Sequence, residues 1–343
     1  MTTPRPRIVI DRHIPFIQGL FEPHADVVYL DGDRIDAAAV RDADALITRT
    51  RTRVDSDLLN GSRVKVVATA TIGTDHIDLA WCADNGIEVA NAPGCNAPAV
   101  AQYVFASLLA VVNRPLPQHT IAIIGVGHIG KIVERWARAM NMRVMLVDPP
   151  RQRAEGGDCW STLDEVARHA DIITVHTPMT RHGEDATHHL IDSNFLGKLR
   201  RFPIIINAAR GPIVDNDALC RALADGIVKD AIIDCWENEP DINRHLLDRA
   251  AIATPHIAGY SIEGKIRATQ AAVATVVRAL GLPPIAVPGT PVADAPTQVP
   301  PAKVADSYDP IADTDALRAD PTRFESLRNN YPHRHEPPQS IND

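Results

Sequence analysis

The sequence predicts an α/β protein with two doubly wound parallel sheets and a short C-terminal segment. From residue 7 to about residue 280, short β-branched apolar runs alternate with longer helical patterns, which is typical of βαβ units. These runs form two groups of five, separated by a helical stretch at residues 97–112. Of the 27 prolines, 12 fall in the last 63 residues, where regular structure should become sparse.

Each expected strand is a short run rich in β-branched residues and bounded by polar or turn-forming ones. The first group is residues 7–10, 27–30, 45–48, 64–70 and 87–90, and the second is residues 121–125, 143–148, 171–177, 204–209 and 231–236. A helical pattern at residues 262–280 follows the last strand, and its apolar spacing suits packing back on the first sheet.

The proline-rich stretch predicts a linker followed by a small helical tail. Proline removes a backbone donor and fixes φ, so residues 282–303 are not expected to form a regular helix or a central strand. Residues 313–332 have the composition of one or two short helices.

Charge and hydropathy exclude several classes of partner. With 35 basic and 43 acidic side chains the net charge is -8, and no run of Lys and Arg suits nucleic acid or an anionic membrane. The longest strongly apolar stretch, residues 104–112, is shorter than the roughly 20 residues that cross a bilayer. No secretory signal pattern opens the chain, and the five cysteines are odd in number and lack CxxC spacing, so we expect a cytoplasmic protein.

A glycine-rich loop, GVGHIG, is the strongest local signal, because it follows a predicted strand and opens a predicted helix. The first glycine permits a tight turn, the second lets the backbone approach a pyrophosphate, and the third allows close helix packing. The residues of this loop that we expect to bind a dinucleotide are Gly125, Gly127, His128, Ile129 and Gly130.

An acidic residue at the end of the next predicted strand favours NAD. Asp148 lies 18 residues after Gly130, where a carboxylate accepts hydrogen bonds from the adenosine ribose and repels a 2'-phosphate. Arg151 and Arg153 lie just beyond and are the argument for NADP, but the strand, the spacing and the acid together favour NAD.

Polar residues also follow the later predicted strands, at the edge where ligands of open α/β sheets bind. Arg210, Asp234, Glu239 and His256 each have an ordinary explanation as single loop residues. Beside a nicotinamide they suit the oxidation of a secondary alcohol. His256 is a suitable base, Glu239 can orient its ring, and Arg210 offers the planar donor pair that matches a carboxylate.

These motifs resemble the signatures of the D-2-hydroxy acid dehydrogenases, in NAARGPIVDNDAL, DCWENEP and TPHIAGYS together with GVGHIG. The resemblance covers roughly residues 5–280 and implies NAD as cofactor and a catalytic trio of Arg210, Glu239 and His256. It also implies a flavodoxin-like substrate domain and a Rossmann NAD domain. The expected boundaries are 1–93 with 262–280 for the substrate domain, 94–261 for the NAD domain, 281–303 for the linker and 304–343 for a shortened tail that resembles a dimerisation domain.

A closer resemblance is to one branch of this family, which oxidises a small phosphorylated hydroxy acid in pyridoxal 5'-phosphate biosynthesis. It is carried by residues 69–109, by VDPPR and by AGYSIEGK. It implies a homodimer, with Arg334 of the tail as a candidate contact for the substrate phosphate. The residues implied to contact substrate are Thr50, Thr71 and Tyr260, and those implied to contact NAD are Thr177, Asp234 and Gly259.

Alternatives remain open at this point. Thr50 alternates with Arg49, Arg51 and Arg53, which suits a phosphorylated substrate but also an exposed edge strand. His76 in GTDHID resembles a metal ligand, yet no partner ligands lie at metal spacing, so we expect a turn and no metal. The alternative functions are a dehydrogenase of 3-phosphoglycerate, glycerate or lactate, and an NAD(H)-sensing binding protein.

Overall fold

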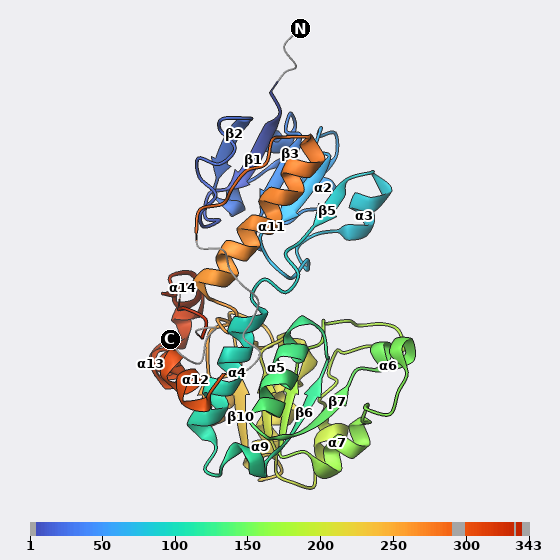
Figure 1. The fold of residues 1–343 in the computed structure, drawn as a ribbon, viewed down its shortest axis with the longest axis vertical. Coiled ribbons are helices and arrows are strands. Elements are labelled where there is room, and N and C mark those ends of the chain that lie inside the picture. Colours follow the sequence, from blue (N-terminus) through green and yellow to red (C-terminus); the bar gives the residue numbers. More distant parts are fainter. Residues whose placement is uncertain (1–4, 290–298, 333, 338–343) are drawn as a thin grey trace. The chain divides into compact units, whose positions relative to one another are not determined.

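The computed structural model describes residues 5–289, 299–332 and 334–337. Residues 290–298 of the predicted linker, and residues 333 and 338–343 of the predicted tail, lie outside the described residues. The chain folds into two compact units (Figure 1). The first unit is Met1–Asn96 with Ile262–Asp294, and the second is Ala97–Ser261 with Ala295–Asp343.

The first unit is a parallel sheet with the strand order β2-β1-β3-β4-β5, which is the flavodoxin-like order. Its strands are β1 (Arg7–Asp11), β2 (Asp26–Leu30), β3 (Ala45–Thr48), β4 (Val66–Thr69) and β5 (Glu88–Ala90). Its helices are α1 (Ala37–Val40), α2 (Ser56–Leu59), α3 (Leu79–Asp84) and α11 (Ile262–Leu280), with a 3-10 turn η1 (Gly32–Arg34).

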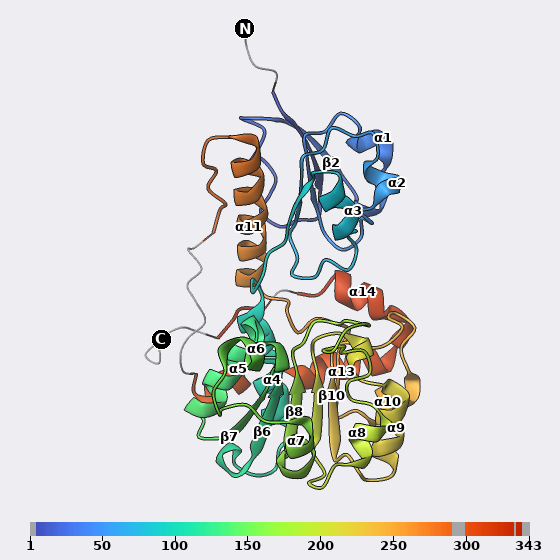
Figure 2. The same ribbon diagram turned by 90° about the vertical axis from the view of Figure 1, so that its right-hand side faces the viewer.

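Both faces of this sheet are covered, because successive side chains of a strand point to opposite sides. Ile8, Ile10 and Ile47 pack under α11, whose Val273 and Val276 are buried against them. The alternating residues of the same strands pack under α1, α2 and α3, which lie on the other face of the sheet from α11 (Figure 2). Helix α11 thus packs on the first sheet although it follows the second unit in the sequence, as its apolar spacing predicts.

The second unit is a six-stranded parallel sheet with the order β11-β10-β9-β8-β6-β7. Its strands are β6 (Thr120–Ile124), β7 (Arg143–Val147), β8 (Ile172–Val175), β9 (Ile204–Asn207), β10 (Asp230–Ile233) and β11 (Ile252–Ala253). Its main helices are α4 (Ala97–Val111), α5 (His128–Ala139), α6 (Pro149–Glu155), α7 (Leu163–His169), α8 (Ser193–Gly197), α9 (Asn216–Ala224) and α10 (Arg244–Arg249), with η2 (Leu116–Gln118) and η3 (Gly211–Ile213). A single parallel bridge from Leu146 to Trp160 stands where a Rossmann fold has its third strand.

The strand order of this sheet reverses between β6 and β8, and that position locates the ligand site. Ligands of open α/β sheets bind in the crevice at such a switch point, outside the carboxyl ends of the strands. Here the residues that follow β6 are Gly125 and Val126, and those that follow β8 are His176 and Thr177. The predicted dinucleotide residues therefore lie at the switch point of the second sheet.

Two features of the second unit correct the prediction. The sheet has a sixth strand, β11, which has only two residues and is too short to show a periodic pattern. A helix, α12 (Pro301–Ser307), begins inside the stretch predicted to be free of helix. Pro301 is tolerated there because the first turn of a helix does not use its own backbone N–H groups.

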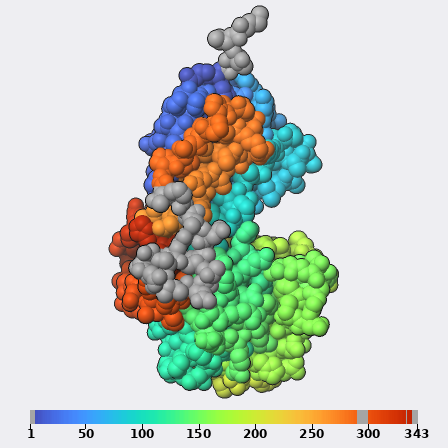
Figure 3. Space-filling model, viewed as in Figure 1, coloured from blue at the N-terminus to red at the C-terminus, as the bar shows by residue number. Residues whose placement is uncertain are grey.

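The C-terminal segment, defined here as the described residues from 299 to 337, packs on the second unit (Figure 3). It holds α12, α13 (Pro310–Ala319), η4 (Pro321–Arg323) and α14 (Phe324–Asn329). Leu317 and Phe324 are fully buried in the core on one side of the sheet, and Val304 is fully buried on the other. In the described part of the chain, no helix is both long and apolar enough to cross a bilayer.

Candidate active site

The glycine loop after β6 has the geometry of a phosphate-binding turn. Gly125 has φ +89°, and a Cβ there would lie 2.7 Å from the carbonyl carbon of His176. A Cβ on Gly130 would lie 2.2 Å from the carbonyl oxygen of Gly125. A Cβ on Gly127 would meet nothing within 4 Å, so open space lies over the first turn of α5. Exposed His128 and half-buried Ile129 begin this helix, whose free amides suit a pyrophosphate.

Asp148 ties the glycine loop to the next strand. Its Oδ2 accepts the Val126 amide at 2.8 Å, and its Oδ1 caps α6 by accepting the Arg151 amide at 3.1 Å. A carboxylate has about four acceptor positions, so lone pairs remain for ribose hydroxyls. The Arg151 side chain is held by both oxygens of Glu155 at 2.8 and 2.7 Å, and Arg153 pairs with Asp185. Both arginines are therefore already neutralised by acidic neighbours.

Two polar atoms at the switch point fit a bound dinucleotide. Thr177 Oγ1 is buried and has no hydrogen-bond partner, at a position expected to contact NAD. The same is true of His176 Nδ1, while His176 Nε2 lies 2.9 Å from Thr174 Oγ1. Burial lowers the pKa of His176 to about 3, so its ring is neutral. A nucleotide is the kind of ligand that supplies partners to such atoms, and the residues present fit NAD.

Asp234, at the end of β10, organises the loop that carries His256. Its buried carboxylate accepts Thr254 Oγ1 at 2.6 Å and the backbone amides of Ile257 and Ala258 at 2.7 and 3.0 Å. Burial raises the pKa of Asp234, against the lowering effect of His256 and of these donors. The carboxylate of Asp234, which is expected to contact NAD, thus also supports the loop that carries His256.

His256 and Glu239 form a close hydrogen-bonded pair. His256 Nδ1 lies 2.8 and 3.1 Å from the two carboxylate oxygens of Glu239, so Nε2 is the nitrogen left for a substrate proton. Glu239 Oε1 also accepts the Trp236 amide at 2.8 Å. Burial acts to raise the pKa of Glu239, but His256, the Trp236 amide and Arg328 lower it below its usual value. The backbone of His256 has φ +57°, a left-handed conformation that is unusual for a non-glycine residue.

Arg210 lies in a turn beside the one that bears Glu239. It follows β9, and the buried amide of Asn207 donates to the carbonyls of Arg210 and Cys235 at 3.0 and 3.2 Å. A Cβ on Gly211 would lie 1.8 Å from the Trp236 carbonyl oxygen, so only glycine fits. The turn that bears Arg210 is thus locked against the turn that bears Glu239. The structure places His256 and Glu239 in contact, and it places Arg210 on an adjoining turn of the same unit.

One cluster of this site has the composition of a metal centre. Cys235, Glu239 and His256 offer ligand atoms within 4.8 Å of one another, and no other such group of three occurs among the described residues. Burial raises the pKa of the Cys235 thiol well above its usual value, so the thiol keeps its proton when no metal is bound. Glu239 and His256 are also bonded to each other. We therefore interpret the cluster as an acid–base pair beside a buried neutral thiol.

The expected substrate contacts of the first unit follow two neighbouring strands. Thr50 is exposed in the turn after β3, and Thr71 follows β4, whose Thr69 lies opposite Thr48 of β3. Because β3 is the central strand of its sheet, the edge-strand alternative for Thr50 is wrong. Thr71 Oγ1 donates to the Gly73 carbonyl at 3.0 Å and lies 2.8 Å from Thr69 Oγ1.

The basic and metal-like residues near Thr50 have local partners. Arg49 donates to fully buried Asp11 at 3.1 Å, and Arg53 donates to Asp55 at 2.6 Å. His76 Nε2 lies 3.4 Å from Thr69 Oγ1, and its carbonyl accepts the Val54 amide at 2.8 Å, so GTDHID forms a turn against β4.

The remaining expected residues, Gly259 and Tyr260, follow His256 in a loop held by the C-terminal segment. Arg334 donates to the carbonyls of Ile257 and Ala258 in this loop and to the side chain of Gln102 at 2.9 Å. Its guanidinium also lies 4.3 Å from the centre of the Tyr308 ring. Arg334 was a candidate contact for the substrate phosphate bound by a partner chain. In the structure, its guanidinium donates instead to acceptors of its own unit.

Sequence reasoning missed two residues of this corner. His176 was not singled out, although its position directly after β8 at a switch point is the signal that identifies it. Arg328 on α14 places Nη1 3.9 Å from Glu239 Oε2. Nothing in the sequence near Arg328 indicates this contact, because it depends on how the C-terminal segment folds back.

The comparisons with known proteins agree with this geometry. Residues 100–258 match the model of the D-isomer specific 2-hydroxyacid dehydrogenase, NAD binding domain. A protein of Bacteroides thetaiotaomicron named erythronate-4-phosphate dehydrogenase is 44% identical, over 96% of this chain and 97% of its own length. One of the same name from Enterobacter sp. is 45% identical, over 77% of this chain and 70% of its own length.

Solved structures share the architecture. The D-lactate dehydrogenase of Aquifex aeolicus, complexed with NAD and lactic acid, has a TM-score of 0.68 and 26% identity. It covers 80% of this chain and 95% of its own. The Bacteroides relative leaves only 4% of this chain unaligned, so its similarity extends into the C-terminal segment.

Asp148 gives the first testable prediction. Asp148→Asn keeps an oxygen for the Val126 amide but removes the charge that repels a 2'-phosphate. We expect the ratio of kcat/KM with NAD to that with NADP to fall about tenfold or more, as for a lost charge contact of order 1.4 kcal/mol. Asp164→Asn, which removes an exposed carboxylate from α7, is the control and should leave the ratio unchanged. An unchanged ratio in Asp148→Asn would contradict the assigned role.

His176 gives a prediction about pH. The unfolded chain protonates this residue below about its usual value of 6.5, whereas the folded protein does so only near 3. Stability should therefore decrease as the pH falls between these values, by up to about 1.4 kcal/mol per pH unit from this residue. His176→Gln should lose less stability than the wild type between pH 7 and pH 5.5, in urea unfolding followed by the fluorescence of buried Trp136 and Trp236. Equal losses in both proteins would show that His176 is not the cause.

Proposed function

The chain belongs to the D-isomer specific 2-hydroxyacid dehydrogenases and is an NAD-dependent oxidoreductase, and from this premise we propose that it oxidises 4-phospho-D-erythronate at C2. The product is 2-oxo-3-hydroxy-4-phosphobutanoate, an intermediate of pyridoxal 5'-phosphate (vitamin B6) biosynthesis. The observation that carries the proposal is the His256–Glu239 pair beside Arg210, in a chain whose relatives of that name match nearly its whole length.

The chain's own residues account for the proton and the substrate orientation. His256 Nε2 takes the proton of the C2 hydroxyl as the C2 carbonyl forms, and Glu239 at Nδ1 stabilises the imidazolium that results. The guanidinium of Arg210 matches the substrate carboxylate and polarises the forming carbonyl. Bound NAD would supply the acceptor for the hydride of C2. The glycine loop, Asp148, Thr177, Asp234 and Gly259 would hold it.

Substrate recognition is assigned to three further residues. Thr50 and Thr71 present hydroxyl groups at the carboxyl ends of neighbouring strands of the first unit, and Tyr260 follows His256 in the second. Hydroxyl groups donate hydrogen bonds to phosphate and carboxylate oxygens without adding charge. We propose that these three residues contact 4-phospho-D-erythronate.

Location and assembly complete the proposal. We propose a cytoplasmic enzyme, because all five cysteines are free thiols and none pairs with another. We also propose a homodimer formed through the C-terminal segment, on its resemblance to a dimerisation domain.

The test of the substrate is NADH formation by the purified protein. We expect selective turnover of 4-phospho-D-erythronate over unphosphorylated D-erythronate and 3-phosphoglycerate. A 2-oxo acid is added in parallel, so that a tightly retained cofactor can be reoxidised. Faster turnover of either other acid would reject the proposed substrate and leave the dehydrogenase chemistry, and NADH binding without turnover of any acid would favour a sensing protein.

His256 tests the mechanism. His256→Ala removes the base, which should reduce kcat roughly 100-fold or more, while NADH binding measured by fluorescence is retained. His245→Ala removes an exposed imidazole from α10 of the same unit and should keep the wild-type rate. If His256→Ala stays within a few-fold of the wild type, another group must take the proton.

A further inference from the structure

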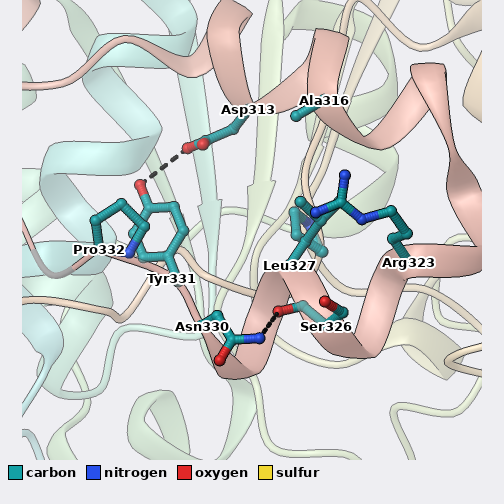
Figure 4. Close-up of a pocket in the computed structure, with 9 residues that line it drawn as sticks. Asp313, Ala316, Arg323, Ser326, Leu327, Asn330, Tyr331 and Pro332 are labelled. Atoms are coloured by element: carbon teal, nitrogen blue, oxygen red, sulfur yellow. Dashed lines mark hydrogen bonds between the residues drawn. The ribbon is translucent and has the colours of Figure 1, made fainter.

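The C-terminal segment packs in the second unit beside the loops that carry Glu239 and His256. A pocket of about 180 Å³ is lined by Pro255, the residue before His256, and by residues of this segment. Figure 4 labels the lining residues that come from the segment. Asp313 at the edge of the pocket accepts hydrogen bonds from the hydroxyls of Tyr308 and Tyr331, both at 2.9 Å. With fully buried Phe324, these contacts fix the position at which α14 begins. The side chains of α14 are thereby held at defined places beside the catalytic loop.

One of them, Arg328, faces catalytic and substrate-binding residues. Its side chain is 21% exposed, and its Nη1 lies 3.9 Å from Glu239 Oε2. The Tyr260 side chain is a second neighbour that raises the pKa of Arg328. Burial acts to lower the pKa of Arg328, and Tyr260 and Glu239 more than reverse this. A guanidinium removed from water needs such partners, so its position is set by these two residues.

Tyr260 receives support from the C-terminal segment on two sides. Its ring meets the edge of Tyr331 at 6.0 Å between centroids and 71° between planes. Its side chain also interacts with the guanidinium of Arg328, whose pKa it raises. Both contacts come from residues that follow the proline-rich stretch. The orientation of Tyr260 therefore depends on a part of the chain that lies outside the strand and helix pattern of the two sheets.

We propose that Arg328 is a positioning residue of this active site, which orients the Tyr260 hydroxyl toward the substrate and keeps the Glu239 carboxylate facing His256. The proposal rests on the proposed function, because Tyr260 and Glu239 are assigned their roles there. A planar guanidinium suits this task, since one group can donate to a hydroxyl and oppose a carboxylate in fixed directions. The carboxylate then has a cation on the side away from Trp236 as well as the imidazole.

A double-mutant cycle of Arg328 and Tyr260 tests the proposal. Arg328→Met removes the charge and keeps much of the side-chain bulk, and should lower kcat/KM roughly 10- to 100-fold, as expected for a lost charge-assisted hydrogen bond. Most of the effect should be a higher KM, because Tyr260 acts in substrate binding. In a Tyr260→Phe background, Arg328→Met should have a clearly smaller effect, because the two residues act through one contact.

Two further variants separate positioning from general support of the fold. Arg328→Lys restores the charge and should recover part of the lost kcat/KM. Arg318→Met is the matched control: Arg318 belongs to α13 of the same segment and donates to the carbonyls of Leu247 and Ala250, away from the substrate residues. It should lower the unfolding temperature and leave KM near the wild-type value.

The outcomes are distinct from those of the substrate test. The cycle is run with whichever 2-hydroxy acid the wild type oxidises, so a wrong substrate assignment does not affect it. Coupling between Arg328 and Tyr260, with rescue by lysine, supports the proposal. Independent, multiplicative effects of the two substitutions, or an equal rise of KM in Arg318→Met, would overturn it.

Discussion

The arrangement of His256 beside Glu239 depends on the hydrogen bonds of the buried Asp234 carboxylate. An isolated carboxylate is costly to bury, and this one is compensated by a hydroxyl and two backbone amides from a single loop. The same bonds hold His256 in a left-handed backbone conformation, which costs of order 1–3 kcal/mol and persists only where its surroundings fix it. The hydrogen bonds that offset the cost of burying the carboxylate thus also fix the direction of the His256 ring.

The turns that carry Arg210 and Glu239 come together through close backbone contacts. Gly211 lets the Arg210 turn touch the Trp236 carbonyl, and the Trp236 amide in turn binds Glu239. Asn207 connects both turns through its side-chain amide. The three side chains proposed for catalysis therefore stand on three loops that share one frame made mainly of main-chain groups. Such a frame maintains the hydrogen-bond distances that proton transfer requires.

The sequence predicted the regular part of this architecture well and the contacts of its irregular part poorly. The ten expected strands and α11 could be identified because periodicity and turn residues are local properties. Motif spacing also led to the prediction of Glu239 and His256 as partners, and the structure places them in contact. The two-residue β11 and the start of α12 at Pro301 carry too little local pattern. Three other contacts depend on long-range packing, which no short stretch of sequence encodes. They are the hydrogen bonds of Asp234 to the loop of His256, those of Arg334 to the same loop, and the approach of Arg328 to Glu239.

The contact between α13 and β11 has a consequence for how two copies of the chain can associate. The backbone amide of Ala253 on this last strand donates to Thr314 Oγ1 of α13 at 3.1 Å, so a side-chain hydroxyl takes the place of a neighbouring strand. An open strand edge is a template for pairing with another molecule, and covering it with a helix removes that template. The second sheet therefore cannot be continued across β11 into another copy. At this edge, association of two chains would have to use helix surfaces or loops instead, and loss of the C-terminal segment would expose β11 to pairing with other chains.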